Sequence, residues 1–213
     1  MGRVLVLTPG SLGGVGDTGR VRRLGILLFD GVEELDAMGP WEVLSYWTSH
    51  HPADGWETRL VARDKVPVTA AKGAVLVPHA AWAPDLDLVV IPGGAGTRAL
   101  MRDAGTLAWV RDLRERGALI TSVCTGALVL AAAGLLAGRA ATTYHASFGE
   151  LLAAEPTCLP DREARWVDTG DVVTAAGVSA GIDMALHLVD RLAGRERARQ
   201  VRRGIQYDPE PPV

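Results

Sequence analysis

The chain has 213 residues, of which 48% are hydrophobic and 22% charged, and its formal net charge is −3. This length allows one well-developed core, and the interspersed charges lack the basic face needed to bind a nucleic-acid backbone. No apolar run reaches the roughly 18 residues of a membrane span, and the N-terminus lacks the pattern of a secretion signal. We therefore expect a cytoplasmic protein that binds neither nucleic acid nor membrane.

The first 23 residues differ in composition from the rest of the chain. Residues 14–19 spell G-x-G-x-x-G, but a dinucleotide-binding glycine motif must follow a strand and open a helix. Here it is followed by Arg20–Arg23 and an apolar strand pattern. We expect residues 1–23 to be a flexible extension and residues 24–213 to form a single domain.

Short β-rich segments alternate with helical patterns from Leu24 onward, and Glu33–Trp47 is expected to be helical with a break at Gly39-Pro40, because proline starts helices more readily than it continues them. In chain order, the other expected elements are strands at Leu24–Phe29, Trp56–Ala62 and Leu88–Ile91, a helix at Thr106–Arg116, a strand that begins at Leu119 and ends before Cys124, a strand at Ala141–Thr143, a helix at Ser147–Ala154, a hairpin of Arg165–Asp168 with Val172–Ala175, and helices at Ala180–Leu192 and Arg195–Ile205. This alternation predicts an α/β fold, with a mostly parallel sheet covered by helices on both faces.

Cys124 stands where an apolar strand passes directly into a helix, which is the arrangement of a nucleophile elbow. The N–H groups of the following helix favour negative charge, so we expect them to lower the pKa of the thiol. The alternative is a buried structural cysteine, a common fate of this residue.

Two other segments leave the carboxyl ends of predicted strands and are expected to meet Cys124 there. Gly93 and Gly94 let backbone N–H groups approach a substrate atom that gains charge, although a Pro-Gly-Gly sequence is also an ordinary turn. Asp36 is a candidate proton donor and acceptor beside the thiol, and its alternative role is to cap the helix expected at Pro40.

The five histidines show no spacing with other ligand types that would predict a metal site, and we expect none. His145 follows a strand near the elbow helix, so a Cys–His dyad is a second hypothesis for activating Cys124. The other cysteine, Cys158, has no paired spacing that would indicate a disulfide framework.

From about residue 24 to the end, the chain resembles the ThiJ/PfpI superfamily of class I glutamine-amidotransferase-like proteins, and within it the isonitrile hydratase branch. The matching segments are Glu34–Leu44, Ile91–Gly94, Thr121–Leu130, Gly134–Leu136, Ala141–Thr143, Ala180–Asp183 and Gln206–Pro212. The aspartate in Leu35-Asp36-Ala37-Met38-Gly39-Pro40 is typical of hydratase-like members, where many relatives carry glutamate.

The resemblance implies a flavodoxin-like three-layer sandwich, a homodimer, Cys124 as nucleophile, Asp36 as its carboxyl partner and Thr125 beside the cysteine. One departure concerns the segment after the elbow helix. Relatives often read Thr-Thr-His-Trp there, whereas this chain reads Thr142-Thr143-Tyr144-His145. A role that the superfamily gives this histidine therefore does not transfer to His145.

The function expected from this resemblance is hydration of isonitriles to N-substituted formamides. Cys124 would form a thioimidate with the small-molecule substrate, Asp36 would exchange protons, and no cofactor would be needed. The alternatives are a glyoxalase-like or other cysteine-dependent hydrolase, and a non-catalytic redox or sensor domain.

Overall fold

The computed structural model describes residues 20–83 and 85–209. The glycine-rich motif and most of the expected N-terminal extension lie outside these residues. The first strand begins at Arg22, so the last two residues of that expected extension belong to the sheet.

A seven-stranded sheet forms the centre of the molecule, in the order β10-β11-β7-β6-β1-β2-β5. Neighbouring strands run parallel except β10 and β11, which form the expected antiparallel hairpin. The strands of this sheet are β1 (Arg22–Leu27), β2 (Trp56–Ala62), β5 (Ala80–Ala81), β6 (Leu88–Ile91), β7 (Leu119–Val123), β10 (Trp166–Asp168) and β11 (Val172–Ala175). The predicted α/β class and mostly parallel sheet are confirmed.

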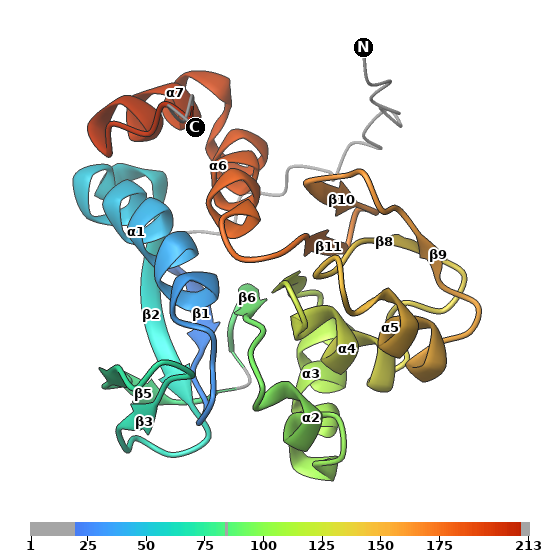
Figure 1. Ribbon diagram of the computed structural model, residues 1–213. Helices are drawn as coiled ribbons and strands as arrows, with labels where there is room; N and C mark the ends of the chain where they lie inside the picture. The colour runs from blue at the N-terminus through green and yellow to red at the C-terminus, as the bar shows by residue number, and fades with distance from the viewer. Residues whose placement is uncertain (1–19, 84, 210–213) are drawn as a thin grey trace.

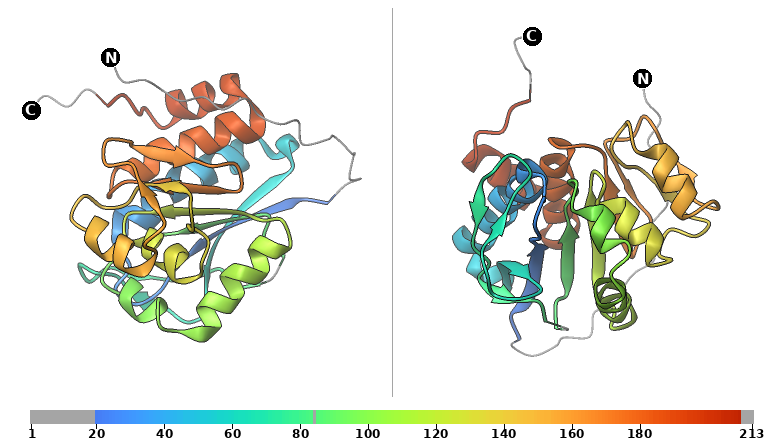
Figure 2. Two further views of the ribbon diagram at one scale, coloured as in Figure 1. Left: turned by 90° about the vertical axis from the view of Figure 1, so that its right-hand side faces the viewer. Right: turned by 60° about the horizontal axis from the view of Figure 1, so that its bottom comes forward.

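Helices cover both faces of the sheet, as Figures 1 and 2 show. One layer holds α1 (Glu34–His50), α6 (Ala180–Ala193) and α7 (Arg195–Gly204). The other holds α2 (Thr97–Leu100), α3 (Ala104–Glu115), α4 (Gly126–Ala132) and α5 (Phe148–Ala154). The remaining elements are a short 3-10 helix, η1 (Pro52–Asp54), and two small sheets that pair β3 (Val68–Thr69) with β4 (Val75–Leu76) and β8 (Ala140–Ala141) with β9 (Leu159–Pro160).

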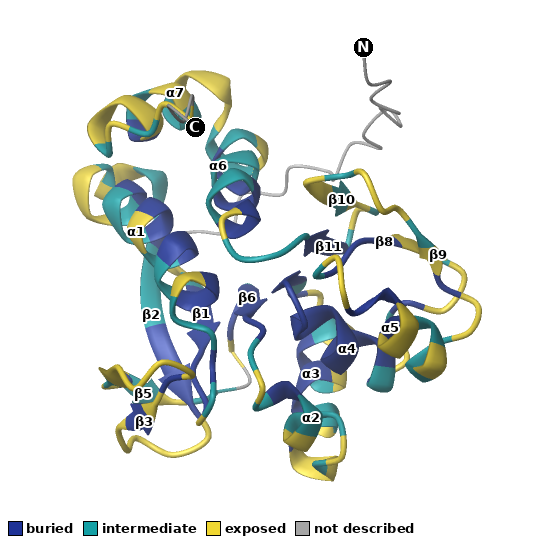
Figure 3. Cartoon of the chain, viewed as in Figure 1, coloured by how far each residue is buried: buried dark blue, intermediate teal, exposed yellow. Residues whose placement is uncertain are grey.

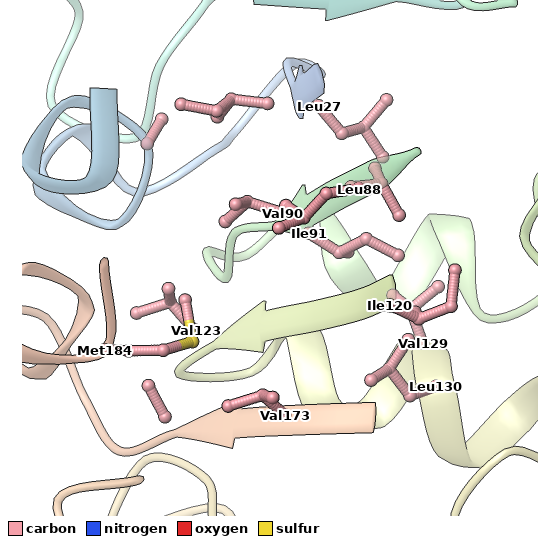
Figure 4. Packing of buried hydrophobic residues seen from close by; sticks show 14 of the residues in the cluster. Leu27, Leu88, Val90, Ile91, Ile120, Val123, Val129, Leu130, Val173 and Met184 are labelled. Atoms are coloured by element: carbon pink, nitrogen blue, oxygen red, sulfur yellow. The ribbon is translucent and has the colours of Figure 1, made fainter. Parts of the chain in front are cut away.

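The core lies between these layers and is densest around the central strands. All four residues of β6 are completely buried, because a parallel strand covered on both faces has no solvent side. Figure 3 shows this concentration of buried residues at the sheet and at α4. In Figure 4, Ile91, Ile120, Val123 and Val173 line neighbouring strands of the packed cluster. No helix in the described part of the chain combines the length and apolar character that a bilayer crossing needs.

The helix break expected at Gly39-Pro40 is wrong, because α1 runs unbroken from Glu34 to His50 with Pro40 inside it. Contacts with α6 explain the continuity. A Cβ on Gly39 would lie 3.0 Å from Ile182, and one on Gly181 would lie 3.2 Å from Pro40. Tertiary packing of α1 on α6 at this point therefore outweighs the backbone hydrogen bond that proline cannot make.

Candidate active site

Three segments that leave the carboxyl ends of β1, β6 and β7 meet at one point of the sheet edge. The segment after β1 pairs with the Pro92–Gly96 loop through a bridge between Val32 and Gly94. The Glu33 N–H also donates a hydrogen bond to the Gly93 carbonyl, at 2.9 Å. The convergence expected from the alternating pattern is present, since residues 57 and 31 positions apart in sequence are hydrogen-bonded to each other there.

Cys124 occupies the turn between β7 and α4 in a left-handed conformation with φ of 57°, which non-glycine residues rarely adopt. Its N–H donates to the carbonyls of Ala175 and Ala176, at 3.1 and 3.0 Å. Its carbonyl accepts a hydrogen bond of 2.8 Å from the Thr143 hydroxyl. The backbone is thus fixed on both sides, and the residue is 6% exposed.

Asp36 lies in the first turn of α1 and is completely buried. Its Oδ2 accepts a hydrogen bond of 2.9 Å from the Gly93 N–H, and its carboxyl also interacts with the Cys124 thiol. Its other oxygen, Oδ1, is buried with no hydrogen-bond partner among the described residues. The alternative role as a helix cap is wrong, because Glu33 holds the N-cap position of α1. Asp36 instead directs its carboxyl toward Cys124, with one oxygen that no other described residue engages.

Thr125 follows the cysteine and connects the elbow to the glycine loop. Its hydroxyl oxygen accepts a hydrogen bond of 2.9 Å from the Gly94 N–H. A Cβ on Gly93 would lie 2.6 Å from the Thr125 nitrogen and 2.7 Å from Asp36 Oδ2. Only glycine allows the loop to come this close to both residues.

These contacts change the expected role of Gly93 and Gly94. Their N–H groups already donate to Asp36 and Thr125, so neither is free to receive charge that develops on a substrate. Through these hydrogen bonds the two glycines fix the positions of the Asp36 and Thr125 side chains. The substrate-binding role inferred from their sequence would require one of these hydrogen bonds to break.

Burial governs the electrostatics of the site. Loss of water raises the pKa of Asp36 to about 7, against the lowering effect of the Gly93 N–H and the Cys124 thiol. Burial also raises the pKa of Cys124 to about 12, helped by the negative charge of Asp36 and opposed by the N–H groups of Thr125 and Val178. The expected lowering of the thiol pKa is therefore wrong, because desolvation outweighs the N–H groups at the elbow.

Cys124 and Asp36 consequently titrate as a pair. The first proton leaves near neutral pH and the second is held until far higher pH. Over that range the pair carries one negative charge and one proton, and transfer of this proton from sulfur to the carboxyl would place a thiolate beside a proton donor. Such a pair can offer a nucleophilic sulfur and a proton donor at the same time.

Two groups near Cys124 were not identified from the sequence. The Val178 N–H points at the thiol, and Val178 has φ of 49°, an unusual conformation for a β-branched residue. Its only sequence signal is the preceding Gly177 at the start of a helix. The other group is the Thr143 hydroxyl.

By contrast, His145 is exposed and packs on the Tyr144 ring, with 4.2 Å between the ring centres, which gives the Cys–His hypothesis no support. Among the described residues no cluster of potential metal ligands occurs.

The raised pKa of Asp36 predicts a pH-dependent cost to stability. Between the ordinary pKa of 3.8 and the folded value of about 7, the folded protein retains a proton that the unfolded chain releases. Stability therefore falls as the pH rises through this window. Asp36→Asn removes this effect, so from about pH 4.5 to about pH 7.5 we expect the variant to gain about 3 kcal/mol relative to the wild type. Urea unfolding of both proteins at the two pH values measures the difference.

The exposed Asp64 serves as control, because Asp64→Asn should show no such gain. If the unfolding free energy of Asp36→Asn relative to the wild type also stayed constant between the two pH values, the burial argument would be contradicted.

The comparisons with known proteins agree with this architecture. Residues 22–191 match the model of the DJ-1/PfpI family. The chain is 41% identical over 194 residues to an isonitrile hydratase of Pseudomonas putida, an alignment that covers 89% of this chain and 80% of that protein. A solved structure of a ThiJ/PfpI family protein from Pseudomonas syringae has a TM-score of 0.80 at 32% identity and covers 95% of this chain and 85% of that one. Drosophila melanogaster DJ-1beta has a TM-score of 0.77 at 22% identity, with coverage of 88% and 98%, and supports the fold alone. These matches confirm the resemblance drawn from the sequence motifs, and the chain belongs to the DJ-1/PfpI family.

Proposed function

We propose that this protein hydrates isonitriles to N-substituted formamides, with Cys124 as nucleophile and Asp36 as the group that exchanges protons. One observation carries the proposal: a completely buried carboxyl, held by the Gly93 N–H, interacts with the elbow cysteine, and burial raises its pKa to about 7. The identity of 41% with an isonitrile hydratase supports the choice of substrate class.

In the first step the Cys124 sulfur bonds to the terminal carbon of the isonitrile. Asp36 delivers its proton to the same carbon, which gives a thioimidate, R–N=CH–S–Cys124, and leaves Asp36 as a carboxylate. The free Oδ1 of Asp36 is the oxygen available for this transfer. A soft sulfur nucleophile suits an isonitrile carbon, and the proton transfer prevents charge from accumulating in a buried site.

In the second step Asp36 takes a proton from water while the water oxygen bonds to the thioimidate carbon. That proton passes to the nitrogen, which gives a neutral tetrahedral adduct. Asp36 then accepts the hydroxyl proton as the C–S bond breaks, which releases the formamide and restores the starting pair. The balance is one isonitrile and one water consumed per formamide formed, without a redox partner.

The hydrogen bonds of the glycine loop favour hydration over a hydrolase reaction. Acyl transfer by cysteine passes through an oxyanion that needs free N–H donors. The N–H groups of Gly93 and Gly94 are already engaged by Asp36 and Thr125. The proposed hydration forms no oxyanion, so it does not need these N–H groups as free donors.

The direct test is formamide production from a small isonitrile, followed by NMR. We expect turnover by the wild type, none by Cys124→Ala, and full turnover by Cys158→Ala, the matched control at the other buried cysteine. Mass spectra taken in the presence of the isonitrile should show a covalent adduct on the wild type and none on Cys124→Ala. Failure of the wild type to make formamide, together with turnover of methylglyoxal, would favour the glyoxalase-like alternative.

Asp36→Asn tests the proton exchange. Asparagine keeps the size of the side chain and an oxygen for the Gly93 N–H, but it cannot transfer a proton. Turnover should fall by about 10²- to 10⁴-fold, the usual loss when a general acid–base group is removed. Asp36→Glu should also be impaired, because the longer side chain displaces the carboxyl from the thiol. Formamide production near the wild-type rate by Asp36→Asn would assign Asp36 a purely structural role.

We also infer a homodimer with a contact near the site. Leu35 is 39% exposed although it is apolar and adjoins the buried Asp36, and two-fold dimers are the commonest assemblies. Light scattering should give twice the chain mass for the wild type and a shift toward the monomer for Leu35→Asp. Leu159→Asp, at an exposed leucine on β9, should leave the mass unchanged; a monomeric wild type would refute the inference.

A further inference from the structure

Tyr144 belongs to a segment that lies directly against the nucleophile. The preceding residue, Thr143, is buried and donates its hydroxyl to the Cys124 carbonyl at 2.8 Å. The Tyr144 carbonyl accepts a hydrogen bond of 2.8 Å from the Ser147 N–H. Tyr144 thus lies between a residue that is bonded to the Cys124 backbone and its own hydrogen bond from Ser147.

A second segment, Ala175–Val178, also contacts the nucleophile. It supplies the carbonyls that accept the Cys124 N–H and the Val178 N–H that points at the sulfur. The Tyr144 ring packs onto Gly177 of this segment so closely that a Cβ there would lie 2.5 Å from the Tyr144 Cδ2. The ring thus connects the two segments that contact Cys124.

The proposed reaction assigns no role to this half-buried ring, since Asp36 and Thr125 supply the polar groups of the site. An isonitrile is linear from its terminal carbon through nitrogen to the first substituent atom. When the carbon bonds to sulfur, the substituent must extend away from Cys124 and past the side chains around it. Among the side chains of the two segments that contact Cys124, that of Tyr144 is the largest, and it is only half-buried.

We propose that Tyr144 is a specificity-determining residue whose ring contacts the N-substituent and favours isonitriles with an aromatic or cyclic apolar substituent. This inference rests on the proposed isonitrile hydration. Contacts with an aromatic face prefer flat and cyclic groups. Tyr144 also occupies the position where many relatives read histidine, so the preference is a property of this chain rather than of the motif.

The first experiment compares phenyl isonitrile with methyl isonitrile. We expect the ratio of their kcat/KM values to fall about two- to tenfold in Tyr144→Leu, which keeps apolar bulk but removes the ring. Tyr144→Phe should retain the wild-type ratio, as should His145→Ala, the control at the adjacent exposed residue. An unchanged ratio in Tyr144→Leu would overturn the proposal.

The second experiment needs no hydratase activity. In a Cys158→Ala background, N-phenylmaleimide and N-methylmaleimide present the same electrophile to Cys124 with different substituents. The ratio of their labelling rates should fall in Tyr144→Leu and recover in Tyr144→Phe. A fall in this ratio without any formamide production would refute the hydratase function but keep the role of the ring.

Formamide production with equal ratios in all variants would refute the role of the ring alone. A higher ratio in Tyr144→Leu would mean that the ring obstructs the substituent, which would also overturn the proposal.

Discussion

The hydrogen bond between the Gly93 N–H and the Asp36 carboxyl is the contact on which the site depends. It joins the segment after β1 to the loop after β6 and directs a completely buried carboxyl toward Cys124. A buried carboxyl with a single backbone donor is poorly solvated, so burial raises its pKa to about 7. The contact therefore fixes the position of Asp36, while burial, which the Gly93 N–H only partly offsets, brings its pKa close to neutral.

Close backbone approach makes this arrangement possible. Gly126 lies so near β6 that a Cβ on it would be 2.0 Å from the Ile91 carbonyl, and a Cβ on Gly94 would be 2.2 Å from the Gly31 carbonyl. Each contact brings the turn after one strand against the turn after another. The left-handed conformation of Cys124 has a backbone cost of about 1–3 kcal/mol, and the hydrogen bonds to Thr143, Ala175 and Ala176 hold it in place. Packing of the whole sheet edge thus maintains a conformation that the local sequence disfavours.

The fold could be predicted from the sequence because hydrophobic period and length separate its strands from its helices. Trp56–Ala62 and Leu88–Ile91 are strands at the expected bounds. The continuity of α1 could not be predicted, since it depends on contacts with α6, more than a hundred residues away. Local propensity at Gly39-Pro40 gives the wrong answer because tertiary packing decides the conformation there.

The candidate site also combines features that the sequence predicts with features that depend on tertiary contacts. Residue types at strand ends identify Cys124 and Asp36 as candidates, because the parallel topology brings those ends together, and Thr125 is implied by the family resemblance. The role of Val178 and the use of the glycine N–H groups depend on three-dimensional contacts that leave no pattern in the sequence.

The direction of the thiol pKa shift is the clearest example of a property that the sequence does not predict. An elbow with nearby N–H groups predicts a thiolate, but the depth of burial reverses that prediction. In the proposed mechanism, Cys124 is therefore activated by proton transfer to Asp36, and the backbone N–H groups stabilise the negative charge that this transfer leaves on sulfur.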